Sequence, residues 1–186
     1  MGPITDEQLQ HGRVQFVSVN KDSGKFEMRK NAYPAFEGFI AGFDKHEMKW
    51  KDQTFWKFDI YLQADLVYQV QFGFYSYTTL SLMNSLLSIA DKLTTNGVLR
   101  LEAGKNSKSG ENYVYLTWNG KKIEWKLPWE DLKFNGKEGD AKLEHRNKII
   151  DKWYDALYTI KPYVAEITNG DAAPQGVPAD DDDIPF

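Results

Sequence analysis

Aromatic and basic residues that alternate along predicted β-strands are the side chains of this 186-residue chain best suited to chemistry. They occupy the strand face opposite the apolar one, where rings can stack on nucleotide bases and cations can follow phosphates. Two further lysines lie in a polar loop that could close over a bound strand. We therefore expect a surface for single-stranded DNA formed by Trp50, Phe55, Lys57, Tyr61, Tyr75, Tyr77, Arg100, Lys105, Lys108, Tyr113, Tyr115, Lys122 and Lys126. The competing interpretation is that these rings pack beneath a C-terminal helix or against a partner subunit.

The end of the chain is a second candidate binding segment, formed by Asp180, Asp181, Asp182, Asp183, Ile184, Pro185 and Phe186. The last ring can fill an apolar pocket, the terminal carboxylate can pair with a basic side chain, and the aspartates can lie along a basic rim. An acidic end that served only solubility would not need Ile-Pro-Phe. We therefore expect this tail to bind partner proteins.

Candidate catalytic residues are scarce in the sequence. It contains no P-loop, GxGxxG, GxSxG or HExxH motif. Its acidic pairs at 130–131 and 138–140 lie in charged, turn-like stretches that are typical of a solvated surface. There is no cysteine, and His11, His46 and His145 lack the spacing of metal ligands. We expect neither an enzyme nor a metal or other cofactor.

The charge of the chain is unevenly distributed. The net charge is −4, but residues 168–186 carry five aspartates and no Lys or Arg, which leaves the remainder near +1. A segregated acidic end on a near-neutral body is typical of an interaction tail. Aromatic residues make up 15% of the chain, more than a core of this size needs, so some rings should be exposed. With no secretory signal and no long apolar run, we expect a cytoplasmic protein without a membrane partner.

The predicted elements follow from the period of the apolar residues. Alternation predicts strands, and a change to helical spacing at residue 80 predicts a helix capped by Thr78 or Thr79. Asn119 and Gly120 between two alternating runs predict a hairpin. The predicted strands lie at 14–19 (a strand or an arm), 36–50, 55–63, 66–77, 98–103, 112–118 and 121–127, and the predicted helices at 80–93 and 140–167.

Three strands, a helix and two more strands have the connectivity of an OB barrel. We expect a mainly β fold: an OB-fold-like five-stranded barrel with a helix inserted between strands 3 and 4, an extra β-ribbon, a C-terminal helix and a disordered acidic tail. Gly38 and Gly42 predict the strong bend that a small barrel needs. An open α+β sheet is the alternative fold. The expected divisions are an N-terminal arm (1–35), an OB-fold domain (36–139), a helix (140–167) and a tail (168–186).

The C-terminal helix carries an apolar repeat of seven residues at Leu143, Ile150, Leu157 and Val164, and Pro162 should kink or shorten it. We expect this helix to pack on the barrel or to form a subunit interface. The oligomeric state therefore stays open, with a homo-oligomer as one outcome.

Two stretches resemble known proteins. Residues 181–186 are similar to the acidic tip with which bacterial single-stranded DNA-binding proteins recruit replication and repair enzymes. Residues 36–127 resemble the divergent OB-fold single-stranded DNA-binding proteins of bacteriophages, in the stretches EGFIAGF from Glu37, FWKF from Phe55 and YVYLTWNGKKI from Tyr113. The resemblance implies coating of single-stranded DNA in replication, recombination and repair, in the cytoplasm of a bacterial host, with partner enzymes recruited through the tip.

Two other functions stay open at this point. An OB-like body could bind protein as an adaptor, with the tail as a second docking peptide. The acidic tail could instead mimic DNA in an inhibitor whose body binds no DNA. The repeat at 140–167 is not part of the bacterial pattern, so the bacterial tetramer is not implied.

Overall fold

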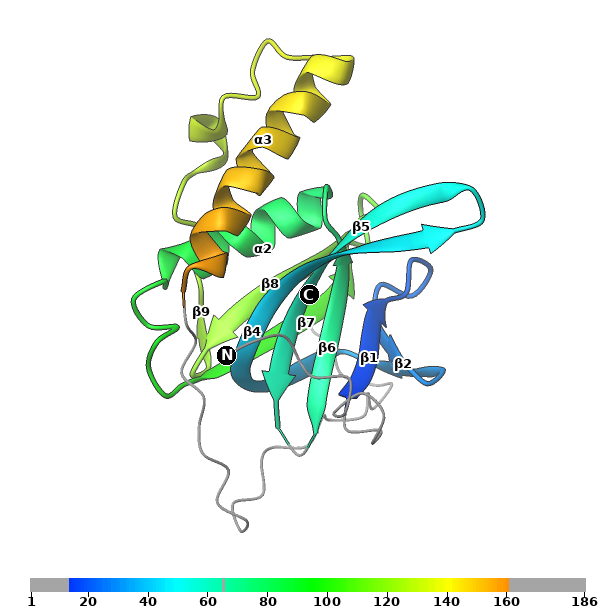
Figure 1. Ribbon diagram of the computed structural model, residues 1–186, viewed down its shortest axis with the longest axis vertical. Helices are drawn as coiled ribbons and strands as arrows, with labels where there is room; N and C mark the ends of the chain where they lie inside the picture. The colour runs from blue at the N-terminus through cyan, green and yellow to red at the C-terminus, as the bar shows by residue number, and fades with distance from the viewer. Residues whose placement is uncertain (1–13, 65, 161–186) are drawn as a thin grey trace.

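The computed structural model describes residues 14–64 and 66–160, which form one curved β-sheet covered by two α-helices (Figure 1). The fold is mainly β, as predicted. The strands are β1 (Val14–Val19), β2 (Phe26–Met28), β3 (Asn31–Tyr33), β4 (Ala35–Trp50), β5 (Gln53–Gln63), β6 (Val67–Gly73), β7 (Val98–Lys105), β8 (Asn112–Trp118) and β9 (Lys121–Lys122). The helices are α2 (Tyr77–Ser88), the short 3-10 helix η1 (Trp129–Leu132) and α3 (Gly139–Tyr158). None of these helices is long and apolar enough to cross a membrane.

The strands form one mixed sheet in the order β3-β2-β1-β6-β5-β4-β7-β8-β9. Only β1 and β6 pair in parallel; the other neighbouring strands in this sheet are antiparallel. No ladder in the described part of the chain joins the two ends of the sheet, so the sheet is open where a closed barrel was expected. Of the two folds expected from the sequence, the open sheet agrees better with this strand pairing than the closed barrel does.

The long strand β4 bends the sheet. Its residues 35–39 pair with β7, and its residues 39–50 pair with β5. The register shifts between Ile40 and Gly42, which confirms the bend predicted from the glycines. The ladder between β5 and β6 ends at Lys57, and past this point β4 and β5 continue as a hairpin that projects from the body (Figure 1).

Residues 14–33, most of which were expected to form an arm, contribute three strands to the sheet. The turn between β1 and β2 contacts the far end of β7 and β8. Lys105 Nζ donates to the carbonyl oxygen of Asp22 (3.0 Å), and Asn112 Nδ2 donates to that of Lys21 (3.1 Å). The sheet is therefore curled enough for distant strands to meet through side chains, without a ladder between them.

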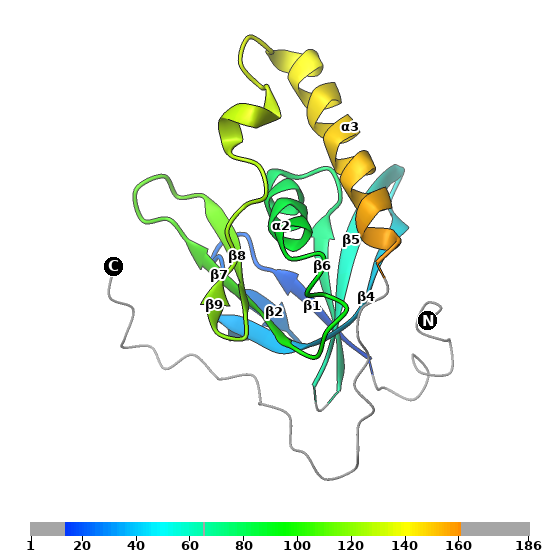
Figure 2. The ribbon, with the colours of Figure 1, turned by 90° about the vertical axis from the view of Figure 1, so that its left-hand side faces the viewer.

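The two α-helices cover the concave face of the sheet (Figure 2). Helix α2 buries Leu82, Met83 and Leu86 against the strands, and α3 packs on α2 and β4. In α3, Ile150 and Leu157 are buried, but Leu143 is exposed because the first turns of the helix extend past the sheet. The seven-residue repeat is therefore a packing stripe only in the second half of α3. Helix α3 ends at Tyr158, and the predicted residues 161–167 lie outside the described residues.

Two boundaries around α2 differ from the prediction. The strand expected over 66–77 ends at Gly73, and the helix begins at Tyr77. The cap is Ser76, whose side chain accepts a hydrogen bond from the backbone N–H of Thr79 (3.1 Å), so the predicted caps Thr78 and Thr79 lie inside the helix. The helix also ends at Ser88, earlier than the predicted residue 93.

The hairpin after β8 is only partly as predicted. The turn is confirmed, since Asn119 and Gly120 both have positive φ angles of 49° and 75°. The following strand is two residues long instead of seven, because buried Asn84 on α2 binds the backbone of Leu127. The Asn84 side chain donates to the Leu127 carbonyl (2.8 Å) and accepts from its N–H (3.0 Å), which pulls the chain away from the sheet and along α2.

Candidate nucleic-acid interface

The outer face of the sheet, opposite the helices, carries seven of the thirteen side chains predicted to contact DNA. They come from neighbouring or nearby strands: Phe55, Lys57 and Tyr61 on β5, Arg100 on β7, Tyr113 and Tyr115 on β8, and Lys122 on β9. Lys105 ends β7 and Lys108 lies in the loop that follows it. Trp50 ends β4, and its side chain is not described. Tyr75, Tyr77 and Lys126 lie outside the strands.

Two exposed tyrosines on β8 form the clearest aromatic platform on this face. Tyr113 and Tyr115 are 45% and 38% exposed, and their rings stack with centroids 6.1 Å apart and planes 24° from parallel. Gly104 on β7 lies directly opposite Tyr113, and a Cβ there would lie 2.6 Å from Cζ of the ring. The absence of a side chain at Gly104 therefore lets the Tyr113 ring lie flat on the sheet.

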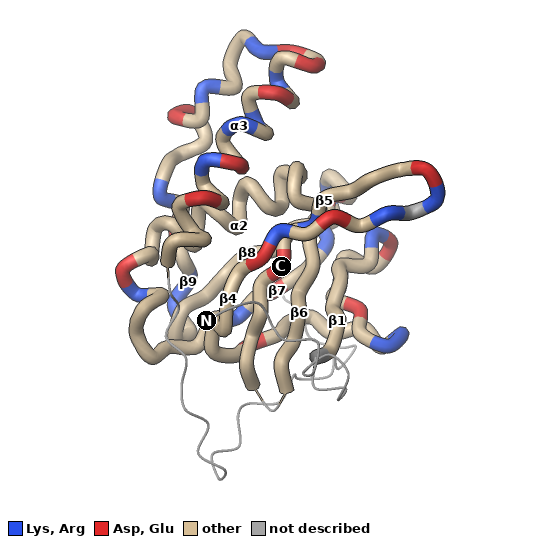
Figure 3. The backbone as a smooth tube through the Cα atoms, in the orientation of Figure 1, with Lys and Arg blue, Asp and Glu red and all other residues tan. Residues whose placement is uncertain are grey.

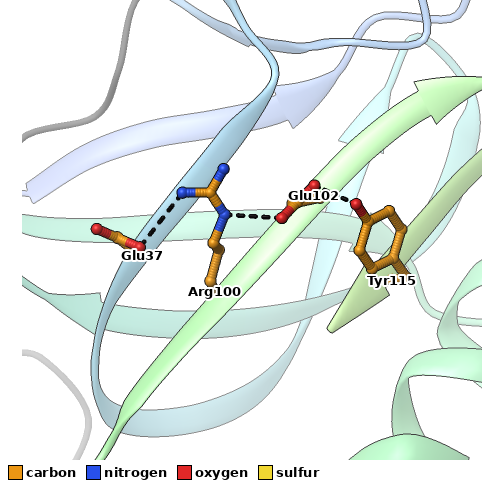
Figure 4. A network of polar contacts seen from close by, with 4 residues as sticks. All are labelled: Glu37, Arg100, Glu102 and Tyr115. Carbon is orange, nitrogen blue, oxygen red and sulfur yellow. Dashed lines mark hydrogen bonds and ion pairs between the residues drawn. The ribbon is translucent and has the colours of Figure 1, made fainter. Parts of the chain in front are cut away.

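Beside these rings lies a polar network of four residues (Figure 4). Arg100 Nε donates to Glu102 (2.8 Å) and Arg100 Nη1 to Glu37 (3.4 Å), and the Tyr115 hydroxyl donates to Glu102. Burial raises the pKa of Tyr115 to about 12, together with the hydrogen bond to Glu102 and its charge, so the phenol stays protonated at neutral pH. Burial opposes the charge on Arg100, but Glu102 and Glu37 outweigh it and raise the pKa of the guanidinium. Arg100 is thus a cation already paired with two carboxylates.

The lysines of the set have weaker partners. Lys122 is exposed and lies 3.9 Å from Glu124, while Lys105 donates to a backbone carbonyl. Acidic and basic residues are interspersed along α3 and the β4–β5 hairpin, without a broad region of one sign (Figure 3). Any binding at this interface must therefore depend more on rings than on a strong positive field.

Tyr61 lies next to the buried carboxylate of Asp59, for which the sequence predicted no role. Asp59 on β5 is fully buried, His46 Nδ1 lies 2.6 Å from its Oδ2, and Gln69 Nε2 donates to the same oxygen (3.0 Å). Burial raises the pKa of Asp59, against the opposing effects of His46 and the hydrogen bond from Gln69. Burial also raises the pKa of Tyr61, followed by the charges of Asp59 and Asp44. The pairing of β5 with β4 and with β6 brings these polar groups together. No local sequence motif predicts this cluster, because its members lie on three different strands.

Tyr75 packs beneath α3, as the competing interpretation expects. Its hydroxyl donates to Asp151 on α3 (3.0 Å), and the same carboxylate pairs with Lys45 Nζ (3.2 Å). Lys45 also lies over the ring of Phe74, 4.0 Å from the centroid. Alternation had placed Tyr75 on an open strand face, whereas the strand ends before it.

Tyr77 belongs to a second aromatic cluster, around η1. Its ring lies under the guanidinium of Arg146 (5.0 Å) and near the ring of Trp129 (6.0 Å). Lys126 follows the short strand β9 and is exposed. Neither residue shares the face of Tyr113 and Tyr115.

Several exposed rings were absent from the predicted set: Phe16, Trp56, Trp125 and Trp129. Trp56 shares a strand face with buried Phe58, so alternation assigned it to the core. It is exposed because it lies just beyond the last ladder pair of β5 with β6, which joins Lys57 to Gly73. The tryptophans at 125 and 129 follow a strand that is shorter than predicted, and their exposure depends on the path that Asn84 imposes.

No group of three or more acidic or histidine side chains in the described ranges could hold a metal ion. The predicted partner-binding residues 180–186 lie outside these ranges. Comparisons with protein-family models, with curated proteins and with solved structures found no match to this chain.

Proposed function

We propose that this chain is a single-stranded DNA-binding protein that coats exposed strands during phage DNA replication, recombination and repair, and that recruits partner enzymes through its acidic tip. The observation that carries the proposal is the exposed, nearly parallel pair Tyr113 and Tyr115 on the outer face of the sheet. Exposed rings of this kind are costly to leave in water and suit stacking on bases.

The arrangement of the central strands supports an OB-like body. The predicted order of three strands, a helix and two strands corresponds to β4, β5, β6, α2, β7 and β8, with β4 bent and central. An OB-like body of this kind is open between β6 and β8, and β1 covers the free edge of β6. OB folds bind oligonucleotides on one face of the sheet.

The spacing of the two rings suits a flexible strand. Residues two apart on a strand are separated by about 6.6–6.8 Å, so Tyr113 and Tyr115 offer two successive platforms to bases that are not paired. Each stack contributes about 1–3 kcal/mol with any base, because every base has a π-face. A base inside a duplex has both faces covered by its neighbours, so this platform favours single strands.

The recruitment role of the tail is supported by its sequence and by its resemblance to the acidic tip of bacterial single-stranded DNA-binding proteins. The aspartates and terminal ring at 180–186 are placed at the end of a stretch that contains glycine, proline and glutamine. Such a segment keeps a docking peptide close to the body at high effective concentration. Enzymes that recognise the tip are in this way brought to the coated strand.

The test is a titration of fluorescent oligo-dT with the full chain, followed by anisotropy. We expect the wild-type chain to bind oligo-dT more tightly than duplex of the same length. Tyr113→Ala and Tyr115→Ala should each weaken binding by about 1–3 kcal/mol without lowering the melting temperature. Tyr158→Ala is the matched control, since Tyr158 is an exposed tyrosine on α3, away from this face. Equal or better binding to duplex would refute the single-strand proposal.

A protein-binding adaptor is the second candidate function, and the β4–β5 hairpin favours it. The hairpin projects from the body and exposes Phe55 and Trp56, which lie on opposite faces of β5. Exposed rings on a projecting ribbon also suit a protein partner. A chain that binds neither oligo-dT nor oligo-dA, while Trp56→Ala abolishes binding to a purified partner, would favour the adaptor.

A further inference from the structure

A groove of about 490 Å³ lies between α2, β8 and the chain that follows β9. Its lining comes from three segments: Ser81 and Ser85 of α2, Val114 and Tyr115 of β8, and Lys122, Ile123, Glu124, Trp125 and Pro128. This volume lies within the range of about 300–1,000 Å³ that is typical of sites for small organic ligands. The groove therefore has room for a planar ring system.

The floor of the groove includes an open strand edge. The N–H of Ala103, the register partner of Val114, points toward Pro34 on the β4 side (2.9 Å), so the Val114 backbone points away from β7. Ile123 N–H binds the carbonyl of Leu116, two residues along the same edge. Strand β9 pairs only with Thr117 and Trp118, so no described strand pairs with the N–H and C=O of Val114.

The walls of the groove supply hydroxyls, a ring and the ion pair of Lys122 with Glu124, whose Nζ and Oε1 are 3.9 Å apart. Ser81 and Ser85 lie one helical turn apart on α2, and neither hydroxyl has a hydrogen-bond partner among the described residues. Trp125 is 41% exposed and Lys122 is exposed at the mouth. Asn84, next to Ser85, holds this wall in place through its two hydrogen bonds to Leu127.

We propose that this groove binds one unstacked base of a single-stranded DNA, an inference that rests on the proposed function. Trp125 stacks on the base, and the Val114 edge with the serine hydroxyls meets the Watson–Crick edge of the base. Each base carries a donor beside an acceptor on that edge, which a backbone N–H and C=O can match. Lys122 lies where it can contact the adjoining phosphate.

The groove is continuous with the proposed aromatic platform. Tyr115 contributes both to the stacked pair and to the groove lining, so a strand that crosses β8 reaches the groove within one nucleotide. The mixture of ring, cation and small hydroxyls favours a nucleotide over an apolar side chain. An extended peptide, which would also pair with a strand edge, is the alternative occupant that the experiment must distinguish.

The experiment measures the affinity of the full chain for oligo-dT and for an abasic strand of equal length. Trp125→Ala should weaken oligo-dT binding about 5- to 150-fold, the loss of one base stack, and should leave binding to the abasic strand unchanged. Trp129→Ala is the matched control: Trp129 is also 41% exposed and lies 6.1 Å from Trp125, but it does not line the groove. It should change oligo-dT affinity by less than about twofold.

A second variant covers the case in which Trp125→Ala lowers the melting temperature. Ser81 is half-buried on α2 and lines the groove, so the larger side chain of Ser81→Phe should fill the groove and cause the same loss of oligo-dT binding. Ser88→Phe, on the same helix but outside the groove, should not cause this loss. If both groove variants bind oligo-dT as the wild type does while Tyr113→Ala weakens it, the groove inference fails and the proposed function stands. If the wild type binds no oligo-dT, both fail. If a synthetic peptide of residues 178–186 quenches the tryptophan fluorescence of the wild type more than that of Trp125→Phe, and oligo-dT shows no such difference, the groove is a peptide site and the inference is overturned.

Discussion

Glu102 should limit the affinity of the proposed interface for DNA, so removing its charge should strengthen DNA binding. In the folded chain Arg100 is held by Glu102 and Glu37, and these three residues together carry one net negative charge next to Tyr115. Glu102→Gln keeps the size and the hydrogen-bonding capacity of the side chain but removes its charge. Arg100 then keeps only one ion pair, the longer contact to Glu37 (3.4 Å), and can turn more easily to a phosphate.

The size of the effect follows from the geometry. The side chains of Arg100 and Glu102 are 34% and 28% exposed, so their ion pair is partly screened and is worth about 0.2–1 kcal/mol. Affinity for oligo-dT at low salt should therefore rise about 1.5- to 5-fold. One added phosphate contact should also steepen the slope of log affinity against log salt by about 0.7, the value for single strands.

The assay is oligo-dT anisotropy over a series of salt concentrations, with Glu144→Gln as the control. Glu144 is exposed on α3 and pairs with Lys148 at 2.6 Å, so its removal changes the total charge equally but far from the sheet. An absorbance titration of tyrosine checks that the network has changed, because the pKa of Tyr115 should fall from about 12 toward its ordinary value of 10. Equal salt slopes for Glu102→Gln and Glu144→Gln would refute the placement of Arg100 on the DNA path.

Three further predictions concern stability and the tail. Gly97→Ala should lower the free energy of unfolding by about 1–3 kcal/mol and the melting temperature by about 2–12 °C, because the added Cβ overlaps the buried indole of Trp118; Gly73→Ala, which meets only ordinary contacts, is the control for the thermal melts. Burial raises the pKa of Asp59 in the folded chain, so its protonated carboxyl stabilises the fold below the ordinary pKa of 3.8, and this contribution is lost as the pH rises through the folded pKa. Asp59→Asn should remove this pH-dependent loss of stability. Urea unfolding from pH 3 to 8 should show a flatter profile for Asp59→Asn than for Asp52→Asn, and identical profiles would contradict the raised pKa. Phe186→Ala should abolish pull-down of a bacterial tip-recognising enzyme and leave oligo-dT affinity unchanged, while deletion of residues 180–186 should raise that affinity modestly at low salt; unchanged pull-down would refute the recruitment role.

The local sequence pattern was sufficient to predict the elements whose structure depends on residues that are close together in the sequence. Alternation located β5 and β8, and the dipeptide at 119–120 located its hairpin turn, because these signals depend on neighbours in the sequence. The register shift in β4 was likewise predicted from Gly42. The outer-face positions of Tyr113 and Tyr115 follow from the same alternation, since β8 is regular over its whole length.

Long-range contacts decided the elements that the pattern missed. The strand expected over 121–127 is short because Asn84, 43 positions earlier in the sequence, binds Leu127. Helix α3 ties Tyr75 to Asp151, a contact across 76 positions that removes this ring from the outer face. The parallel pairing of β1 with β6 joins segments about 50 residues apart, and the local sequence of β1 does not indicate which strand it pairs with. Such contacts form only in the assembled fold, so they are not predicted by the periodicity of apolar residues along the sequence.

The charges of the described interface explain why aromatic stacking must dominate any DNA binding there. Arg100 is engaged by two carboxylates, Lys105 donates to the Asp22 carbonyl, and Lys122 lies near Glu124. Each of these cations must give up or share a partner before it contacts a phosphate, so its net electrostatic contribution is small. The rings of Tyr113 and Tyr115 have no such competing partner for their exposed faces. If this face binds DNA as proposed, it should distinguish strands by whether their bases are free to stack, and a strand without bases should be its poorest ligand.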